Sequence, residues 1–212
     1  ADNQGNVPYL PKKEVYNFNI MDGNCYRAQD PLLGTTGTGG STWSRLGDLL
    51  IQAGEFDRVL IVPIALGGST VKQWSPNGNA NLRLKLAIKM LRLLKINISH
   101  IAWVQGSSDA GLGTTTSEYS EHLIDLIDNI RLHEVVAPIF IALTSRCGAV
   151  LSEEVRRGQL FVSKSTPNVF LGPDIDSINF PGSRYDGCHV SGAGLDRNAE
   201  LWLKVLQNFS KQ

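Results

Sequence analysis

The chain has 212 residues, of which 42% are hydrophobic, and its 20 basic and 20 acidic side chains cancel to a net charge of zero. This length suits one globular domain, which we assign to residues 1–212. The balanced charge and a pI near 7.1 remove the electrostatic basis for a nucleic-acid groove or an anionic membrane surface. No apolar run approaches the ~20 residues of a membrane span. We therefore expect neither nucleic acid nor a membrane as a partner.

In chain order, the apolar patterns predict a strand over 15–20, a glycine-rich loop over 34–40, a helix over 43–53, a strand over 59–65, a helix over 82–94, a strand over 98–104, a helix after Thr115, a strand over 135–143, a helix over 152–161, a short strand over 169–171 and a helix over 195–209. Strands that alternate with helices predict right-handed crossovers and a mostly parallel sheet covered on both faces. The fold class expected is therefore a three-layer α/β/α sandwich, in which functional residues gather on the loops after the carboxyl ends of the strands.

Three of these helices carry distinct apolar stripes. The helix over 43–53 places Leu46, Leu49 and Leu50 on one side. The helix over 82–94 aligns Leu82, Leu86, Met90 and Leu93. The helix after Thr115 begins with a capping box from Thr115 to Glu118 and continues through Leu123, Ile127 and Ile130. We expect these stripes to face the core.

The first residue and the cysteines bear on processing and compartment. Because the chain starts at Ala1 rather than Met and shows no signal-peptide pattern, we expect it to have been processed, trimmed or cut from something longer. Cys25, Cys147 and Cys188 are too widely spaced for a disulfide framework or a zinc motif. One bridge with a free thiol and three buried thiols both fit. The compartment stays open, with a secreted or periplasmic protein favoured over a cytoplasmic one.

The sharpest chemical pattern is Asp186 and His189, three residues apart in a glycine-containing loop before the last helix. At this spacing the carboxylate can bend back onto the imidazole Nδ1 and fix its tautomer, which leaves Nε2 to accept a proton from a nucleophile. A solvent-facing pair that caps the final helix is an equally good interpretation of the spacing alone. The other histidines, His100, His122 and His133, lie at helix ends or on helix faces, where structural roles are the better interpretation.

Two post-strand loops are also unusual in composition. Gly67 and Gly68 fit an oxyanion hole, because glycine lets a backbone N–H approach developing negative charge, although a tight turn explains them equally. Gln105 offers a second donor through its side-chain amide or simply holds the loop. Asp109 is more plausibly a loop anchor than a catalytic acid. Trp74 either lines a pocket or, more simply, packs against the helix that starts at residue 82.

Taken together, these loops resemble the SGNH hydrolases, in particular the sialate O-acetylesterase and carbohydrate acetylesterase branch. That branch carries a Gly-Gly-small-small motif followed by Trp, then W-H-Q-G-E-S-D, then D-x-x-H. The matching residues here are Gly67, Gly68, Ser69, Thr70 and Trp74; Trp103, Gln105, Gly106, Ser108 and Asp109; and Asp186 and His189. The resemblance implies that His189 is the general base, that Asp186 orients it, that Gly68 and Gln105 stabilise the oxyanion, and that Gly67, Ser69 and Trp74 contact substrate.

The chain departs from the family pattern in two places. The His and Glu of the Gln105 loop are replaced by Val104 and Ser107. The nucleophilic serine motif, which the family carries after its first strand, is absent from residues 1–212 together with that strand. We expect both to precede Ala1, because a parallel sheet without a central strand leaves backbone groups unpaired on both neighbours. Substitution by Ser41 or Ser69 is an alternative, although a helix N-cap or turn explains each serine better. A strand supplied by a separate polypeptide after cleavage is another.

The function implied is a serine-type esterase that removes small acyl groups, such as acetyl, from a hydroxylated substrate, in particular a carbohydrate, through an acyl-enzyme. No metal and no organic cofactor is expected, and the partner is a small-molecule or glycan ester. An inactive carbohydrate-binding module on the same scaffold is the alternative, because the nucleophile is absent and Val104 and Ser107 replace the family's His and Glu. A nucleotide-binding domain is disfavoured, since the chain has no Walker loop and no well-placed G-x-G-x-x-G. The sequence does not indicate an oligomeric state.

Overall fold

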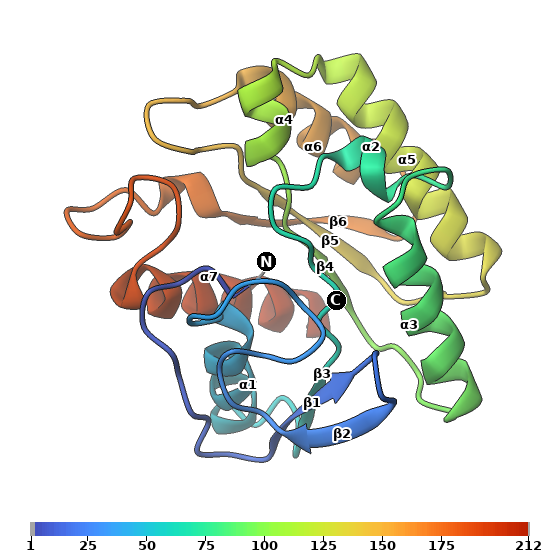
Figure 1. The fold of residues 1–212 in the computed structure, drawn as a ribbon, viewed down its shortest axis with the longest axis vertical. Helices are drawn as coiled ribbons and strands as arrows, with labels where there is room; N and C mark the ends of the chain where they lie inside the picture. The colour runs from blue at the N-terminus through green and yellow to red at the C-terminus, as the bar shows by residue number, and fades with distance from the viewer. Residues whose placement is uncertain (1–2, 212) are drawn as a thin grey trace. The chain divides into compact units, whose positions relative to one another are not determined.

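The computed structural model describes residues 3–211, which form two compact units. The first, which we call the terminal unit, contains the residues up to Gly67 and from Ser177 onward, and the second, the central unit, runs from Gly68 to Asp176. Each has its own three-stranded sheet and its own flanking helices (Figure 1). The expected α/β class, with parallel strands flanked by helices, is confirmed. The assignment of residues 1–212 to one domain stays a prediction.

The terminal unit is built on strand β1 (Val15–Asn19), which lies between two partners. It pairs in parallel with β3 (Val59–Ile61), with Val15 opposite Val59, and antiparallel with β2 (Asn24–Arg27). Helix α1 (Thr42–Gln52) packs on β1 and β3, and the last helix, α7 (Gly192–Ser210), packs along α1 (Figure 1). Trp43 and Trp202 join these two helices, with ring centroids 5.4 Å apart.

The central unit has an all-parallel sheet with the strand order β4 (Ile101–Trp103), β5 (Ile139–Leu143) and β6 (Val169–Asp174). Helix α6 (Glu153–Ser165) packs on β5 and β6, and α5 (Thr116–Leu132) packs on α6. The other helices of this unit are α2 (Val71–Trp74), α3 (Asn81–Leu93) and α4 (Ser107–Leu112). A 3-10 turn, Ile175–Ser177, follows β6. No helix among residues 3–211 has both the length and the apolar character needed to cross a bilayer.

Four strands are shorter than the apolar runs that predicted them, including β4, which covers only Ile101–Trp103 of the run over 98–104, and proline explains the shortening of β3 and β5. The run over 59–65 forms a strand only as far as Ile61, because Pro63 has no N–H to donate to a ladder. Beyond it, the carbonyl of Ala65 instead accepts from the Thr35 hydroxyl at 2.9 Å. The run over 135–143 becomes a strand only at Ile139, directly after Pro138. Antiparallel strand β2 was not predicted, since its residues are exposed and carry no apolar pattern.

The stripe predicted for the helix over 82–94 is wrong. Leu82 and Leu93 are 68% and 67% exposed. The buried side of α3 instead carries Leu84, Ala87, Ile88 and Leu91. The predicted and the buried residues both repeat at helical spacing, so this leucine-rich helix has two possible apolar faces. Which face is buried depends on the elements that pack against the helix. The stripe of α5 is confirmed, since Leu123, Ile127 and Ile130 are at most 4% exposed. In α1, Leu46 and Leu50 are buried as expected.

One of the three histidines assigned to helices lies elsewhere. His100 directly precedes β4 and is not on a helix, so that part of the prediction was wrong. Burial lowers the pKa of its imidazole. His122 lies on α5, and His133 caps the end of that helix, where its Nδ1 is 3.0 Å from the Asn129 carbonyl oxygen. Among the cysteines, Cys25 is an exposed free thiol on β2.

Candidate active site

The terminal unit brings Asp186 and His189 into direct contact. The Nδ1 atom of His189 lies 2.7 Å from Asp186 Oδ2. The other carboxylate oxygen, Oδ1, accepts from the backbone N–H groups of His189 at 2.7 Å and of Cys188 at 2.9 Å. The carboxylate is thus held by its own loop and holds the ring in turn. No residue among 3–211 hydrogen-bonds to His189 Nε2, which leaves that nitrogen available to accept a proton.

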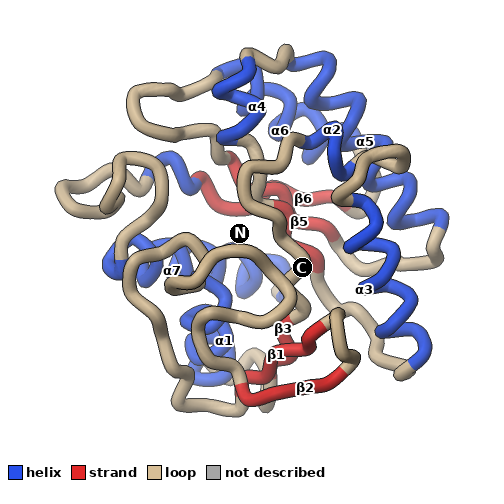
Figure 2. The backbone as a smooth tube through the Cα atoms, in the orientation of Figure 1, coloured by secondary structure: helices blue, strands red, loops and turns tan. Residues whose placement is uncertain are grey.

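The loop that carries this dyad is fixed at both ends. The Tyr185 ring stacks on the His189 ring with centroids 6.2 Å apart, and the Tyr185 hydroxyl donates to the carbonyl of Gln4 at 2.9 Å. After the dyad, Ser191 caps α7 by accepting from the N–H of Gly194. Figure 2 shows the segment between the 3-10 turn and α7 as a loop. The local spacing therefore produces the dyad, and the capping of the last helix is done by Ser191.

The contacts of the dyad keep the Asp186 carboxyl charged. Partial burial raises the pKa of the Asp186 carboxyl, but hydrogen bonds from the His189 ring and from the backbone of His189 and Cys188 outweigh burial and lower it to about 2. Both side chains are about two-fifths exposed, which gives small molecules access to the pair. A carboxylate that remains charged at neutral pH can stabilise an imidazolium formed during proton transfer.

The two glycines after β3, Gly67 and Gly68, differ in whether their backbone N–H is hydrogen-bonded. The N–H of Gly67 donates to the Thr36 hydroxyl at 2.6 Å and is therefore engaged within the terminal unit. Gly68 has φ +72°, a left-handed conformation that favours glycine, and a side chain built there would meet nothing within 4 Å. No residue among 3–211 hydrogen-bonds to the Gly68 N–H, so Gly68 is the better oxyanion donor of the two.

In the central unit Gln105 holds its loop with both amide hydrogens. Its Nε2 donates to the carbonyl of Ser69 at 3.0 Å and to Asp109 Oδ2 at 2.5 Å. Asp109 is almost fully buried and also accepts from the backbone N–H of Val71 at 3.0 Å. The loop-anchor interpretation of Asp109 therefore holds. For Gln105 to donate to an oxyanion, one of these two bonds must be given up.

Ser69, whose carbonyl accepts from Gln105, also contacts Trp74. The indole N–H of Trp74 donates to the Ser69 hydroxyl at 2.8 Å. Both residues are buried, and the Trp74 ring meets Trp103 edge-on at 5.9 Å. These contacts favour a packing role for Trp74, while contact of its ring with the helix predicted from residue 82 stays a prediction. The substrate contacts expected of Gly67, Ser69 and Trp74 stay predictions.

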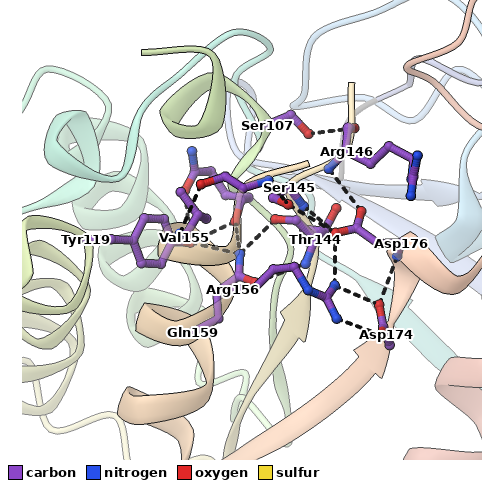
Figure 3. Close-up of polar contacts among 12 residues, drawn as sticks. Ser107, Tyr119, Thr144, Ser145, Arg146, Val155, Arg156, Gln159, Asp174 and Asp176 are labelled. Carbon is purple, nitrogen blue, oxygen red and sulfur yellow. Dashed lines mark hydrogen bonds and ion pairs between the residues drawn. The ribbon is translucent and has the colours of Figure 1, made fainter. Parts of the chain in front are cut away.

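A second polar network, which sequence reasoning missed, fixes the loops after β4 and β5 (Figure 3). The Gln159 amide Nε2 donates to the carbonyls of Thr144 at 2.8 Å and of Gln105 at 3.0 Å, and its Oε1 accepts from the Thr144 N–H at 3.0 Å. The buried Tyr119 hydroxyl donates to the same Gln105 carbonyl at 2.7 Å. These residues lie inside helices, where no sequence pattern distinguishes them from ordinary core positions.

The remainder of this network is an ion cluster at the end of β6. The Arg156 guanidinium contacts Asp174 at 2.8 Å and Asp176 at 2.9 Å, and hydrogen bonds with Asp174 raise the pKa of Arg156. Asp176 also accepts from the backbone N–H groups of Ser145 and Arg146. The rule that post-strand positions carry polar function could have identified both acids, had the strand been extended beyond residue 171.

Comparison with known proteins now places the chain. Residues 11–199 match the family described as carbohydrate esterase, sialic acid-specific acetylesterase. The chain belongs to this family. The carbohydrate esterase family accounts for about nine-tenths of the chain and includes every residue of the loops described above, and the resemblance to the acetylesterase branch of the SGNH hydrolases is confirmed. No curated protein matches the chain in sequence.

Solved structures support the fold of this carbohydrate esterase. An Arabidopsis thaliana protein superposes with a TM-score of 0.76 at 20% identity, covering 95% of this chain and 82% of its own. The psychrotrophic esterase EstA of a Pseudoalteromonas species, whose structure was solved with monoethylphosphonate as inhibitor, superposes with a TM-score of 0.61 at 16% sequence identity. The match covers 81% of this chain and 88% of EstA. A candidate GDSL-like lipase from Parabacteroides merdae superposes with a TM-score of 0.61 at 16% sequence identity. The match covers 93% of this chain and 97% of the lipase. The chain thus has the fold of an ester hydrolase.

Proposed function

We propose that this carbohydrate esterase removes acetyl groups from a hydroxylated substrate, a sugar ester, by a serine-type mechanism with His189 as the base. The observation that carries the proposal is the 2.7 Å contact between His189 Nδ1 and Asp186, which leaves Nε2 available. A neutral imidazole held in this tautomer is the group that activates a serine hydroxyl in unrelated serine hydrolases. The family description supplies the acetyl group and the sugar.

The chemistry proceeds in two halves. His189 Nε2 takes the proton of the serine hydroxyl as its oxygen attacks the acetyl carbonyl carbon, and Asp186 stabilises the resulting imidazolium. The imidazolium then protonates the departing sugar oxygen, so the sugar leaves as an alcohol and the acetyl group stays on the serine. In the second half His189 deprotonates a water molecule, which attacks the acetyl-serine, and the proton returns to the serine as acetate departs.

The tetrahedral oxyanion needs hydrogen-bond donors that are already in place. The Gly68 N–H is one, because a left-handed glycine presents its backbone without a side chain. Gln105 is the second, exchanging its bond to the Ser69 carbonyl for one to the oxyanion while Asp109 keeps hold of the same amide nitrogen. That the dyad and these two donors face one cleft follows from the family resemblance and remains part of the proposal.

The two substitute nucleophiles considered from the sequence are poorly suited to the role. Ser41 is 1% exposed and serves as the N-cap of α1, its hydroxyl accepting from the Trp43 N–H. Ser69 is 6% exposed and accepts from the Trp74 indole. A nucleophile needs access to the ester, and neither hydroxyl has it. The proposal therefore uses the family's own serine.

Hydrolysis of p-nitrophenyl acetate tests the mechanism, with the full-length polypeptide including any residues encoded ahead of Ala1. We expect His189→Ala to lower kcat by about 10³-fold or more. His133→Ala, which removes a histidine from the end of α5, serves as the matched control and should keep wild-type turnover. A fluorophosphonate probe should label the wild-type serine. Equal turnover by wild type and His189→Ala would reject the assignment of the base.

A further inference from the structure

The ring of His189 is not held in place by burial. Its side chain is 40% exposed and belongs to a loop, and the 2.7 Å contact of Nδ1 with Asp186 fixes one point of the ring. A ring that is held at one point can still turn about that contact, and exposed side chains change rotamer on the picosecond to nanosecond timescale. A general base works only while Nε2 points at the proton that it removes. The plane of the His189 ring therefore needs a second contact.

Tyr185 provides this second contact. The planes of the Tyr185 and His189 rings lie 26° from parallel, with the ring centroids 6.2 Å apart. The backbone N–H of Tyr185 also donates to the carbonyl of His189 at 3.2 Å. An antiparallel bridge between Arg184 and Val190 closes the loop around the two residues. Tyr185 therefore contacts the base through its ring and through its backbone.

The Tyr185 ring is itself anchored at a distant part of the terminal unit. Its hydroxyl donates to the carbonyl of Gln4 at 2.9 Å. The preceding residue, Asn3, is 1% exposed, and its side-chain amide exchanges two hydrogen bonds with the backbone of Leu32, at 2.8 and 3.0 Å. The hydroxyl of Tyr185 is thus bonded to a fixed point of the backbone, which holds the far end of the ring.

The glycine-rich loop over 34–40 explains how the backbone around Gln4 is fixed. Gly5 and Gly40 exchange two backbone hydrogen bonds across an antiparallel bridge. A Cβ atom at Gly39 would collide with the carbonyl oxygen of Gly5. The glycines therefore allow two backbones to pack directly against each other, without side chains between them. This loop, for which the sequence gave no role, is the contact surface of the segment that accepts the Tyr185 hydroxyl.

We propose that Tyr185 is a positioning residue of this esterase, which fixes the plane of the His189 ring and thereby the direction of Nε2. The inference deepens the proposed function and rests on it, because His189 is the base there. Asp186 sets the tautomer, the ring of Tyr185 limits rotation about the Asp186 contact, and the bond to Gln4 holds the Tyr185 ring. The family motif begins at Asp186 and assigns no role to Tyr185. Because Tyr185 acts through His189, its loss changes kcat and leaves KM as it is.

Steady-state hydrolysis of p-nitrophenyl acetate by the full-length polypeptide tests this role. We expect Tyr185→Leu to lower kcat by about 10- to 100-fold with KM unchanged, because a misdirected base reacts less often. Tyr185→Phe keeps the ring and loses only the hydrogen bond to Gln4, so it should restore kcat to within about fivefold of wild type. Tyr26→Leu is the matched control and should keep the wild-type kcat, since Tyr26 is also exposed and also donates through its hydroxyl, to Asp22 at 2.9 Å on the hairpin of β1 and β2.

NMR relaxation of the His189 ring tests the positioning independently of turnover. With ¹³C-labelled histidine, the ring order parameter should be about 0.85 in wild type and Tyr185→Phe and should fall below about 0.6 in Tyr185→Leu. The His189 signal is assigned by its loss in His189→Ala, and circular dichroism verifies that each variant is folded.

Two results would overturn the role of Tyr185. One is a His189 ring that is as rigid in Tyr185→Leu as in wild type. The other is a rise in KM at unchanged kcat, which would make Tyr185 a substrate contact instead. Turnover that persists in His189→Ala would reject the proposed function itself, and the ring order in the Tyr185 variants distinguishes this failure from a failure of the positioning.

Discussion

At the scale of single residues, Asp186 does its work through the ring that it holds. Replacing Asp186 by Asn keeps the shape of the side chain but removes the charge and allows the wrong imidazole tautomer. We expect Asp186→Asn to lower kcat for p-nitrophenyl acetate by about 10²- to 10⁴-fold at neutral pH, by analogy with the same change in chymotrypsin-like triads. Steady-state kinetics measure this directly. Asp125 offers a matched control, since it also faces a histidine three residues away, His122, at 4.0 Å on α5. Asp125→Asn should be indistinguishable from wild type.

The lowered pKa of Asp186 gives this residue a defined pH signature. Because its pKa in the folded protein is about 2, below the ordinary aspartate value, the stabilisation from its contacts is present above about pH 4 and is lost as the pH falls toward 2. Titration of Asp186 should therefore contribute no step to the pH profile of kcat/KM between about pH 4 and 9. A ¹³C NMR titration of the Asp186 carboxyl provides the measurement. A midpoint near 4 would show that the dyad is not formed in solution.

Substitutions at two glycines, Gly68 and Gly111, separate the effect of backbone conformation on stability from the effect of steric room for a side chain. A side chain at Gly68 or at Gly111 would meet nothing within 4 Å, but only Gly68 has a positive φ, +72°. Gly68→Ala should therefore destabilise the fold by about 1 kcal/mol through backbone strain. Gly111→Ala, inside helix α4, should be neutral or stabilising by up to about 1 kcal/mol. Urea unfolding of the two variants measures the difference, and equal effects would argue against the left-handed turn.

At the scale of secondary-structure elements, Gln159 ties two loops to helix α6. Gln159→Met keeps the volume but leaves the Thr144 N–H and the carbonyls of Thr144 and Gln105 without this partner. We expect a loss of about 2–4 kcal/mol in the free energy of unfolding, measured in urea. Gln207→Met is the matched control, because Gln207 lies on helix α7 and makes one hydrogen bond, to Glu55. It should cost about 1 kcal/mol or less. Similar losses of unfolding free energy in the two variants would contradict the view that Gln159 holds the two loops to helix α6.

Elements whose determinants are local could be predicted from the sequence. The capping box of α5 forms as its spacing predicts, with the Thr115 N–H donating to Glu118 at 3.0 Å, and the Asp186–His189 contact likewise needs only a three-residue loop. The Asp–His pair and the Ser41 N-cap are both short-range, which is why they were accessible. Strand β3 ends before Pro63 and strand β5 begins after Pro138, and the apolar pattern alone did not account for these prolines.

What depends on distant neighbours was not predictable in the same way. The buried side of α3 is chosen by the elements around it, so a stripe through Leu82 and Leu93 was as consistent with the sequence as the real one through Leu84 and Leu91. For Gln105 the sequence left open an oxyanion donor or a side chain that holds its loop, and the bonds of its amide to Ser69 and Asp109 come from residues that local spacing does not connect to it. The long-range hydrogen bonds from Gln159 on α6 and the ion pairs of Arg156 are not indicated by any local sequence pattern.

At the scale of the whole molecule, the question is whether the two compact units unfold together. The sequence predicts one domain, and the tryptophans provide a reporter for each unit: Trp43 and Trp202 in the terminal unit, Trp74 and Trp103 in the central one. Replacing either pair by Phe leaves fluorescence that reports on the other unit. We expect the urea transition seen by fluorescence in each double variant to coincide with that seen by far-UV circular dichroism in the same protein.

The comparison within each double variant matters because Trp→Phe changes at buried positions alter stability by themselves. Trp202 is 1% and Trp74 4% exposed, so both pairs will shift the midpoint, and only the agreement of two probes in one protein is informative. Coincident midpoints and slopes would support a single cooperative domain. A fluorescence transition that separates from the dichroism transition, in either double variant, would show that the units unfold independently. In that case an unfolding free energy would have to be assigned to each unit separately, including the effects expected for Gly68→Ala and Gln159→Met.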